Sequence, residues 1–297
     1  MPKTKRKKRV TAGRKVEIEA PDKAESSSKE QKATTSTITP ADHVATYDLS
    51  KEAQALVSSV SQDSHAMTLA HEFRDLCSRH ANPSNAAAMR QYMRNKFAFF
   101  GLKAPERRQL QKKFTSAHRD EIVSRPFLLR FAMSLWEQEE RECQLYGVDL
   151  MSEFRREALG ETDADFAEAV ACAEVLITTK SWWDTVDMLA SHMVGYMVSQ
   201  RKEKGVALME QWIASPCLWL RRTALLHQLN YKAETDVKVL FKFCLAVAGE
   251  EEFFIRKAIG WALRQYSWTD SNAVRQFVET NRDSLSKLSV REASKHL

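Results

Sequence analysis

The sequence predicts an all-helical protein in which about a dozen helices stack into a solenoid. Helix breakers are sparse, with 8 glycines and 7 prolines among 297 residues, and no proline lies between Pro126 and Pro216. Apolar residues recur at the three- and four-residue spacing of a buried helix face, as they do from Leu69 to Cys77. Convincing two-residue alternation, which would indicate strands, is absent.

The first 48 residues are expected to form a disordered basic tail. They are rich in Lys, Ser, Thr and Glu, so they bury too little apolar surface to offset the entropy of ordering. The basic cluster in residues 3–15 indicates a nuclear localisation signal recognised by an import receptor, with a non-specific polyanion-binding arm as the alternative. We therefore expect a nuclear protein, with a cytoplasmic location as the alternative. No apolar run suits a signal peptide or a membrane span, so no membrane contact is expected.

Charge and cysteine content restrict the classes of function. Residues 1–16 hold eight basic and no acidic side chains, so the net charge of +6 leaves −2 on residues 17–297. A nucleic-acid surface in the folded part must therefore be a local patch. The five cysteines are scattered without a C-x-x-C pair, which favours packing thiols over disulfides or zinc. Nucleotide-binding and serine-hydrolase motifs are absent, so no metal or other cofactor is expected.

Residues 49–297 are expected to form one domain, whose first half divides at residues 82–85, 101–105, 125–126 and 160–163. The first apolar run, Leu69 to Cys77, precedes these breaks. Pro105 and Glu106 suit the first turn of a helix, which would then present Arg107, Arg108, Lys112 and Lys113.

The second half divides at residues 215–216, 233–236 and 249–252. Helix-spaced apolar residues fill the segments 166–177, 206–213 and 240–247. Helix pairs that recur every 35–45 residues or so are typical of HEAT-type repeats. We therefore predict a HEAT-like helical-repeat solenoid, an α-α superhelix with a concave face, in a monomeric protein.

The segment Ser181-Trp-Trp-Asp-Thr-Val-Asp187 is the strongest candidate for a site. Trp183 and Asp187 are four residues apart and share a helix face. An exposed indole beside a fixed carboxylate can hold an electron-poor sugar or a cation. The alternative is that both tryptophans belong to the core and Asp187 is a solvated helix charge. Trp182 is expected to pack, and Asp184 to favour the dipole at the helix start.

Three further segments combine aromatic and basic side chains. They are Tyr92-Met-Arg-Asn-Lys-Phe97 with the downstream Arg107 and Arg108, Trp219-Leu-Arg-Arg222, and Phe253 to Arg264. In the last, Phe254, Trp261 and Arg264 share a helix face, and Gly260 needs a reason such as close approach of a backbone or ligand. Such a set suits a nucleic-acid groove, in which cations meet phosphates and aromatic faces meet bases or sugars. Core aromatics with solvated surface ion pairs are the alternative.

These segments resemble the AlkD-type DNA alkylation-repair glycosylases over about residues 65–285. The resemblance rests on Lys180 to Asp187, Trp219 to Leu226, Phe253 to Arg264, and the Tyr92 segment with Phe100-Gly-Leu and Pro105-Glu-Arg-Arg. It implies a HEAT-like solenoid that grips duplex DNA and excises N3- or N7-alkylated purines in base excision repair. It also implies that the base is not flipped into a pocket.

The resemblance assigns roles to residues of this chain. Trp183 and Asp187 would flank the deoxyribose of the lesion, with Asp187 ionised and facing DNA, and Trp261 would complete the catalytic set. Arg222 would bind a phosphate, and Tyr92 matches the tyrosine near the N-terminus of the family. We expect the wider DNA-binding set to include Arg94, Arg107, Arg108, Lys180, Phe254, Lys257 and Arg264. The alternative function is a non-catalytic HEAT-like module that binds DNA structures or a protein.

Overall fold

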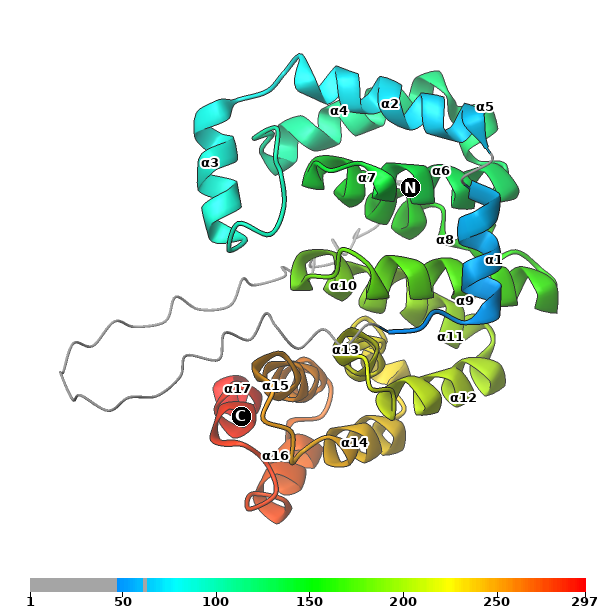
Figure 1. Cartoon of the computed structure of the whole chain (residues 1–297). Coiled ribbons are helices and arrows are strands. Elements are labelled where there is room, and N and C mark those ends of the chain that lie inside the picture. Colours follow the sequence, from blue (N-terminus) through cyan, green and yellow to red (C-terminus); the bar gives the residue numbers. More distant parts are fainter. Residues whose placement is uncertain (1–46, 61–62) are drawn as a thin grey trace, which may run out of the picture. The chain divides into compact units, whose positions relative to one another are not determined.

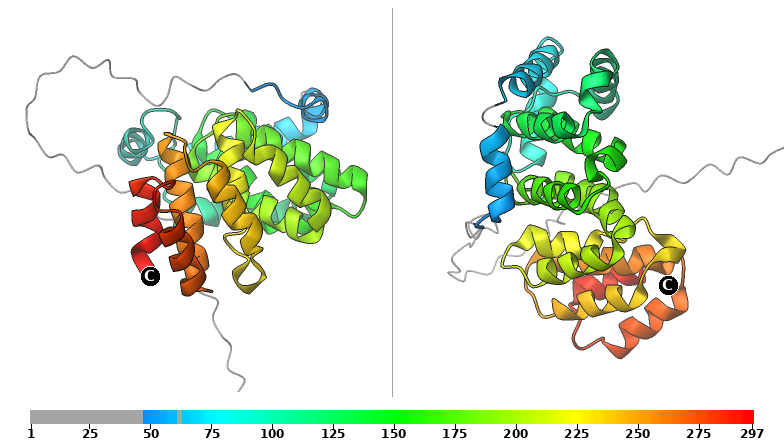
Figure 2. Two further views of the ribbon diagram at one scale, coloured as in Figure 1. Left: turned by 90° about the horizontal axis from the view of Figure 1, so that it is seen from below. Right: turned by 90° about the vertical axis from the view of Figure 1, so that its right-hand side faces the viewer.

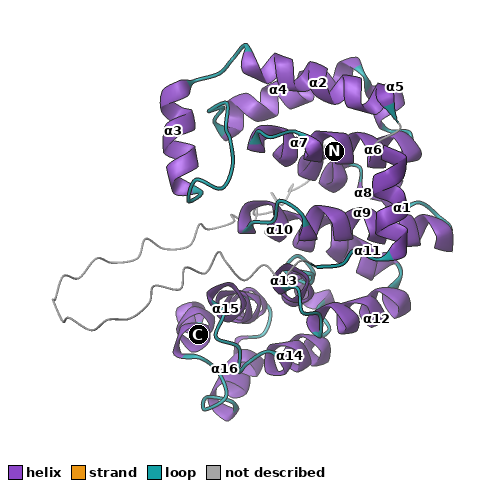
Figure 3. Cartoon of the chain, viewed as in Figure 1, coloured by secondary structure: helices purple, strands orange, loops and turns teal. Residues whose placement is uncertain are grey.

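The computed structural model describes residues 47–60 and 63–297, and all regular secondary structure in these residues is helical (Figures 1 and 3). Extended backbone pairs in the described residues at one isolated bridge, between Ala98 and Glu140. The prediction of an all-α helical-repeat fold is confirmed. The expected disorder of residues 1–48 and the import signal at 3–15 fall almost wholly outside the described residues and stay predictions.

The described helices belong to one compact unit. Their bounds are α1 Lys51–Val60, α2 Ser64–Ser78, α3 Pro83–Tyr92, α4 Ala104–Ala117, α5 Arg119–Ile122, α6 Arg125–Glu137, α7 Arg141–Glu153, α8 Arg155–Leu159, α9 Asp163–Thr178, α10 Trp183–Met188, η1 Leu189–Val194, α11 Gly195–Gln200, α12 Lys202–Ile213, α13 Leu218–Leu226, η2 Lys232–Glu234, α14 Val237–Ala246, α15 Phe253–Ser267, α16 Ser271–Thr280, α17 Lys287–Ala293 and η3 Ser294–His296. Eleven of the described α-helices are 10–16 residues long, close to the dozen expected, and shorter helices such as α5, α8, α10 and α11 lie between them.

The helices stack in successive layers along the unit (Figures 1 and 2). α6 packs against α2 and α7, α13 packs against α12 and α15, and α15 packs against α17. α1 lies across α6 and α9, and there the backbone N and Oγ of Ser50 donate to the buried Glu174 carboxylate at 2.7 Å each. None of the described helices has the length and apolar character of a membrane span.

Helix α3 stands away from the stack (Figure 1), and none of its residues is buried. It is fastened at its N-terminal end, where Asn82 N donates to Phe100 O at 2.8 Å. Gly101 allows this approach, because its φ is +90° and a Cβ there would lie 2.2 Å from Asn82 O. A cavity of about 370 Å³ separates the other end of α3 from α7 and the start of α10. Tyr92, the last residue of α3, is therefore exposed beside the start of α10.

The segment from α10 through η1 to α11 is one continuous helical run. Its middle part, η1, is a π-helix, so the α-helical hydrogen-bond pattern is interrupted directly after α10. Ser191 of η1 donates its Oγ–H to the carbonyl oxygen of Asp187 at 2.7 Å. This irregular turn therefore begins within one turn of Asp187.

Gly260 gives a first testable prediction about packing. A Cβ at this position would lie 2.4 Å from Glu292 Cβ and 2.8 Å from Ser289 O, so the close approach of α17 accounts for the glycine. We expect Gly260→Ala to lower the free energy of unfolding by about 1–3 kcal/mol through overpacking. Gly249→Ala is the matched control, because nothing lies within 4 Å of that position. Urea unfolding of both variants measures the effect, and equal stability of the two would contradict the packing.

Candidate active site

The site is built around the bend that joins α9 to α10. Lys180 has a positive φ of 45°, which is uncommon for a residue with a side chain and turns the backbone sharply. Trp182 follows in extended conformation as the N-cap residue, and α10 begins at Trp183. The bend therefore sends the two neighbouring indoles to different surroundings.

Trp182 packs into an aromatic cluster with Trp219 of α13 and Phe254 of α15. The ring centroids of Trp182 lie 5.9 Å from Trp219 and 5.2 Å from Phe254. Lys96 places its ammonium 5.0 Å from the Trp182 ring, a contact that sequence reasoning missed. The expected packing of Trp182 is confirmed, and Phe254 forms part of the same cluster.

Trp183 remains half-buried and meets Tyr92 of α3. Their rings are edge-to-face with centroids 6.1 Å apart, although the two residues are far apart in sequence. The Tyr92 side chain is 52% exposed, and burial of its hydroxyl raises the pKa of Tyr92. The structure thus brings together two aromatic residues that were predicted to contact DNA.

Asp187 forms a buried, bidentate ion pair with Arg222. Arg222 Nε donates to Asp187 Oδ1 at 2.7 Å, and Arg222 Nη2 donates to Asp187 Oδ2 at 2.8 Å. Only 2% of Asp187 and 3% of Arg222 is exposed. Burial raises the pKa of Asp187, while the charge and hydrogen bonds of Arg222 act in the opposite direction. The expectation that Asp187 lies open toward DNA is wrong in this structure, because a buried carboxylate requires its counter-charge.

Arg222 is also not displayed for phosphate binding, which corrects the expectation from the resemblance. Its remaining terminal nitrogen donates to the carbonyl oxygen of Phe254, so the guanidinium joins α10, α13 and α15. Arg222 therefore orients Asp187 and links the aromatic cluster to it.

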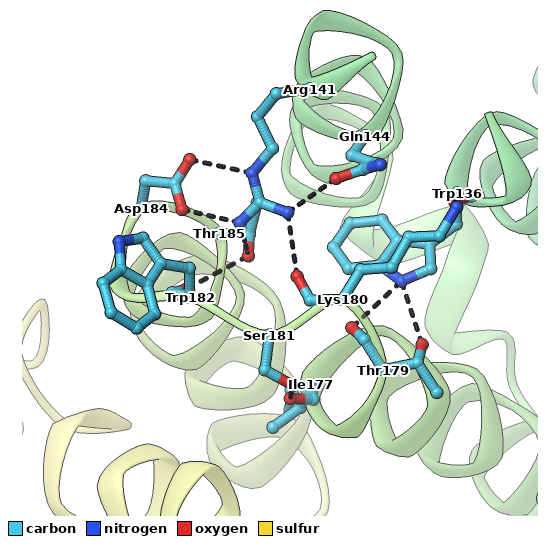
Figure 4. A network of polar contacts seen from close by, with 10 residues as sticks. All are labelled: Trp136, Arg141, Gln144, Ile177, Thr179, Lys180, Ser181, Trp182, Asp184 and Thr185. Atoms are coloured by element: carbon cyan, nitrogen blue, oxygen red, sulfur yellow. Dashed lines mark hydrogen bonds and ion pairs between the residues drawn. The ribbon is translucent and has the colours of Figure 1, made fainter. Parts of the chain in front are cut away.

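A second ion pair holds the start of α10, and sequence reasoning missed it. Arg141 of α7 donates from Nε and Nη2 to the two Asp184 oxygens at 3.0 and 2.6 Å (Figure 4). The Arg141 side chain has no exposed surface, whereas 11% of the Asp184 side chain is exposed. In the sequence, Arg141 stands among Glu139, Glu140 and Glu142 and looks like part of a solvated charged segment. Asp184 thus has a specific partner besides its place at the helix start.

Lys180 was predicted to contact DNA, which stays a prediction; the residue is exposed, and in this structure its ammonium group is bound within the protein. Its Nζ donates to the carbonyl oxygens of Trp136, Glu137 and Gln138 at 2.7, 2.8 and 2.9 Å. These carbonyls lie at and beside the C-terminal end of α6, where helical partners are missing. Burial lowers the pKa of Lys180. This lysine caps a helix.

The remaining predicted cations are either exposed or paired with carboxylates. Arg94 and Arg108 are exposed, whereas Arg107 is buried and pairs with Asp149 at 2.8 Å, so the expected display of Arg107 is wrong. Lys257 and Arg264 lie beside the buried Glu292 carboxylate of α17, with nitrogen–oxygen distances of 3.0 and 3.4 Å. These two side chains help to join α15 to α17, and a DNA contact by either stays a prediction.

Trp261 lies on α15, seven residues after Phe254, and is 9% exposed. A separation of seven residues corresponds to about 10 Å along a helix, so Trp261 lies about two turns from the aromatic cluster that contains Phe254.

The described residues contain no group of three or more His, Cys, Asp or Glu side chains arranged to hold a metal ion. The groups available at the bend are two carboxylates held by arginines, Asp184 and Asp187, together with aromatic faces.

Comparisons with known proteins agree with this arrangement of helices and motifs. A family model described as DNA alkylation repair enzyme matches residues 74–297. A solved structure titled as a predicted DNA alkylation repair enzyme from Enterococcus faecalis is 32% identical, with a TM-score of 0.65. The similarity covers 73% of this chain and 96% of that chain. A search of curated proteins gives no match.

Proposed function

We propose that this chain, which belongs to the DNA alkylation repair enzyme family, hydrolyses the N-glycosidic bond of cationic alkylated purines in duplex DNA. Family membership supports an enzymatic role in DNA repair. The proposal adds the reaction, the substrates N3-alkyladenine and N7-alkylguanine, and the residues. The observation that carries it is the carboxylate of Asp187, held in a fixed orientation four residues after the half-buried Trp183.

One carboxylate is sufficient for this chemistry. A purine alkylated at N3 or N7 is positively charged and leaves as a neutral base, so the general acid that ordinary glycosidases use is not required. Positive charge then develops on the sugar, and a preorganised carboxylate stabilises it. The carboxylate can also orient the attacking water. At about 4 Å and an effective dielectric constant of about 20, a unit-charge pair is worth roughly 4 kcal/mol.

Arg222 supports this role by binding both oxygens of the carboxylate. Two parallel hydrogen bonds from Arg222 favour the ionised form of Asp187 and fix the plane of its carboxylate. Burial acts in the opposite direction, because it favours the protonated form. We propose that Trp183 and Trp261 contribute cation–π attraction of about 0.5–2 kcal/mol each toward the sugar cation. Exposed Tyr92, Arg94 and Arg108 would contact the DNA around it.

The test is release of 7-methylguanine and 3-methyladenine from methylated duplex DNA, followed by chromatography. We expect release by the wild type and a rate about 2- to 30-fold lower for Trp183→Ala. Trp268→Ala is the matched control, because Trp268 is 63% exposed at the end of α15, outside the proposed site, and should be neutral. No release by the wild type would overturn the glycosylase proposal.

A non-catalytic DNA-structure or protein-binding module is the alternative, and one observation favours it. Asp187 and Arg222 satisfy each other and are buried together, as a purely structural pair would be. This alternative predicts salt-dependent binding to unmodified or branched DNA without base release. The chromatographic assay and a binding titration on the same preparation separate the two functions.

A further inference from the structure

Three consecutive residues at the start of α7 hold three different parts of the molecule. Glu140 accepts two hydrogen bonds from Arg74 of α2, both at 2.8 Å. Glu142 accepts from the backbone N–H groups of residues 100–102 at 2.9–3.1 Å, which fixes the loop that fastens α3. Arg141, between them, binds the bend before α10. The start of α7 is therefore a common anchor for α2, α3 and α10.

The Arg141 guanidinium is fully satisfied by this bend and by α7 itself (Figure 4). Besides the two bonds to Asp184, its Nη2 donates to Thr185 Oγ1 at 2.9 Å. Its Nη1 donates to the Lys180 carbonyl oxygen at 2.9 Å and to Gln144 Oε1 at 2.6 Å. The ring of Phe97 lies 3.8 Å from the guanidinium carbon. Five N–H donors thus have partners, and the planar group is held on one face by an aromatic ring.

These contacts fix the backbone both before and after Trp183. Arg141 holds Lys180 on one side of the two tryptophans and Asp184 and Thr185 on the other, so the backbone between them has little freedom. The backbone N–H of Arg141 also donates to Ala98 O at 2.9 Å, in the loop that follows α3. Tyr92 and Trp183, which touch each other, are therefore both carried by segments that Arg141 holds.

We propose that Arg141 is a positioning residue for the reaction: it acts through Trp183 and sets the angle at which the indole meets the sugar. The inference rests on the proposed function. Arg141 has no exposed surface, so it does not touch DNA itself. It also pairs with Asp184 beside the cavity under α3, so this carboxylate holds the bend.

Lysine cannot replace Arg141 in this role. An ammonium group keeps the charge but has three donors and no planar fork, so it cannot hold Asp184, Thr185 and Lys180 at the same time. Arg141→Lys should therefore keep a counter-charge near Asp184 while loosening the bend. A displacement of about 1 Å in a catalytic group can lower a rate by about a hundredfold.

The test is a double-mutant cycle on single-turnover release of 7-methylguanine, using the full chain. We expect Arg141→Lys to lower the rate about 5- to 30-fold, because removal of Trp183 itself sets the upper limit, with less than about threefold change in DNA affinity. In the Trp183→Phe background the same substitution should cost less than about threefold, because the residue through which it acts is gone. Equal losses in both backgrounds would show a merely structural role and overturn the proposal.

Arg74→Lys is the matched control, since it makes the same change at Glu140 without touching the bend. We expect it to leave the rate unchanged. Asp184→Asn is a second variant, for use if Arg141→Lys does not fold. It weakens the same contact from the carboxylate side, so we expect it to give the same loss of rate.

A second readout separates this proposal from the glycosylase reaction. The fluorescence difference between each protein and its Trp183→Phe partner isolates the Trp183 signal. Acrylamide should quench that signal more strongly in Arg141→Lys than in the wild type or Arg74→Lys. If the wild type releases no base but this difference is present, the glycosylase reaction fails and the positioning of Trp183 stands. If the difference is absent, positioning by Arg141 is wrong whatever the activity.

Discussion

Replacing Asp187 with Asn is expected to lower the single-turnover rate of 7-methylguanine release about a thousandfold. The substitution keeps the shape of the side chain and removes the charge that would oppose the sugar cation. Loss of roughly 4 kcal/mol of transition-state stabilisation corresponds to that factor. Release from methylated duplex DNA at saturating enzyme measures it, with DNA affinity determined separately.

Asp149→Asn is the control for this substitution. Asp149 also pairs with a buried arginine, Arg107, at 2.8 Å, so the same chemical change is made at an ion pair outside the bend. We expect its rate to stay within about threefold of the wild type. Similar rates for Asp187→Asn and the wild type would remove Asp187 from the mechanism, provided that both proteins are folded.

Removing Arg222 is expected to have the largest effect on stability. Arg222→Ala leaves a carboxylate that is 2% exposed without its counter-charge, which costs about 3–5 kcal/mol when a buried pair is broken. In a domain of this size, such a loss lowers the melting temperature by on the order of 10 °C. Thermal unfolding at pH 7 measures the shift. Arg108→Ala, which removes an exposed arginine, should change the melting temperature by less than about 2 °C.

A paired substitution separates stability from catalysis. Asp187→Leu with Arg222→Met replaces the ion pair by apolar side chains, which is often neutral or stabilising at buried pairs. We expect this double variant to recover most of the melting temperature and none of the base release. Recovery of both would mean that the pair is structural, whereas recovery of neither would indicate that Arg222 stabilises the fold through Phe254.

The fold was predictable where the sequence marks its own helix ends. The breaks expected around Asn82, Pro126 and Pro216 fall beside helix boundaries, because Gly and Pro change the backbone locally. The end of α7 at Phe154 has no such residue and was missed. Tertiary packing sets such an end, and local sequence does not show it.

The site was predictable in its residue types and only partly in its geometry. Motif spacing selected Trp183 and Asp187, because residues four apart share a helix face. It did not show that Asp187 is buried, since that depends on Arg222, which is 35 positions further along the chain. Arg141 was missed for the same reason, because its partner Asp184 lies 43 positions away. A surrounding of acidic residues made this arginine look solvent-exposed.

The π turn at η1 affects how relatives of this chain should be aligned. A π turn holds more residues than an α turn, so the helix faces before and after it are out of phase. A relative with an unbroken α-helix here would need a one-residue gap inside the helix, where alignments normally allow none. Without that gap, every position downstream would be compared with a neighbour about 100° away around the helix. Loss of a single residue between Leu189 and Val194 would turn Asp187 by the same angle relative to α11. An in-frame deletion in this helix would therefore disrupt the site as directly as a substitution at Asp187.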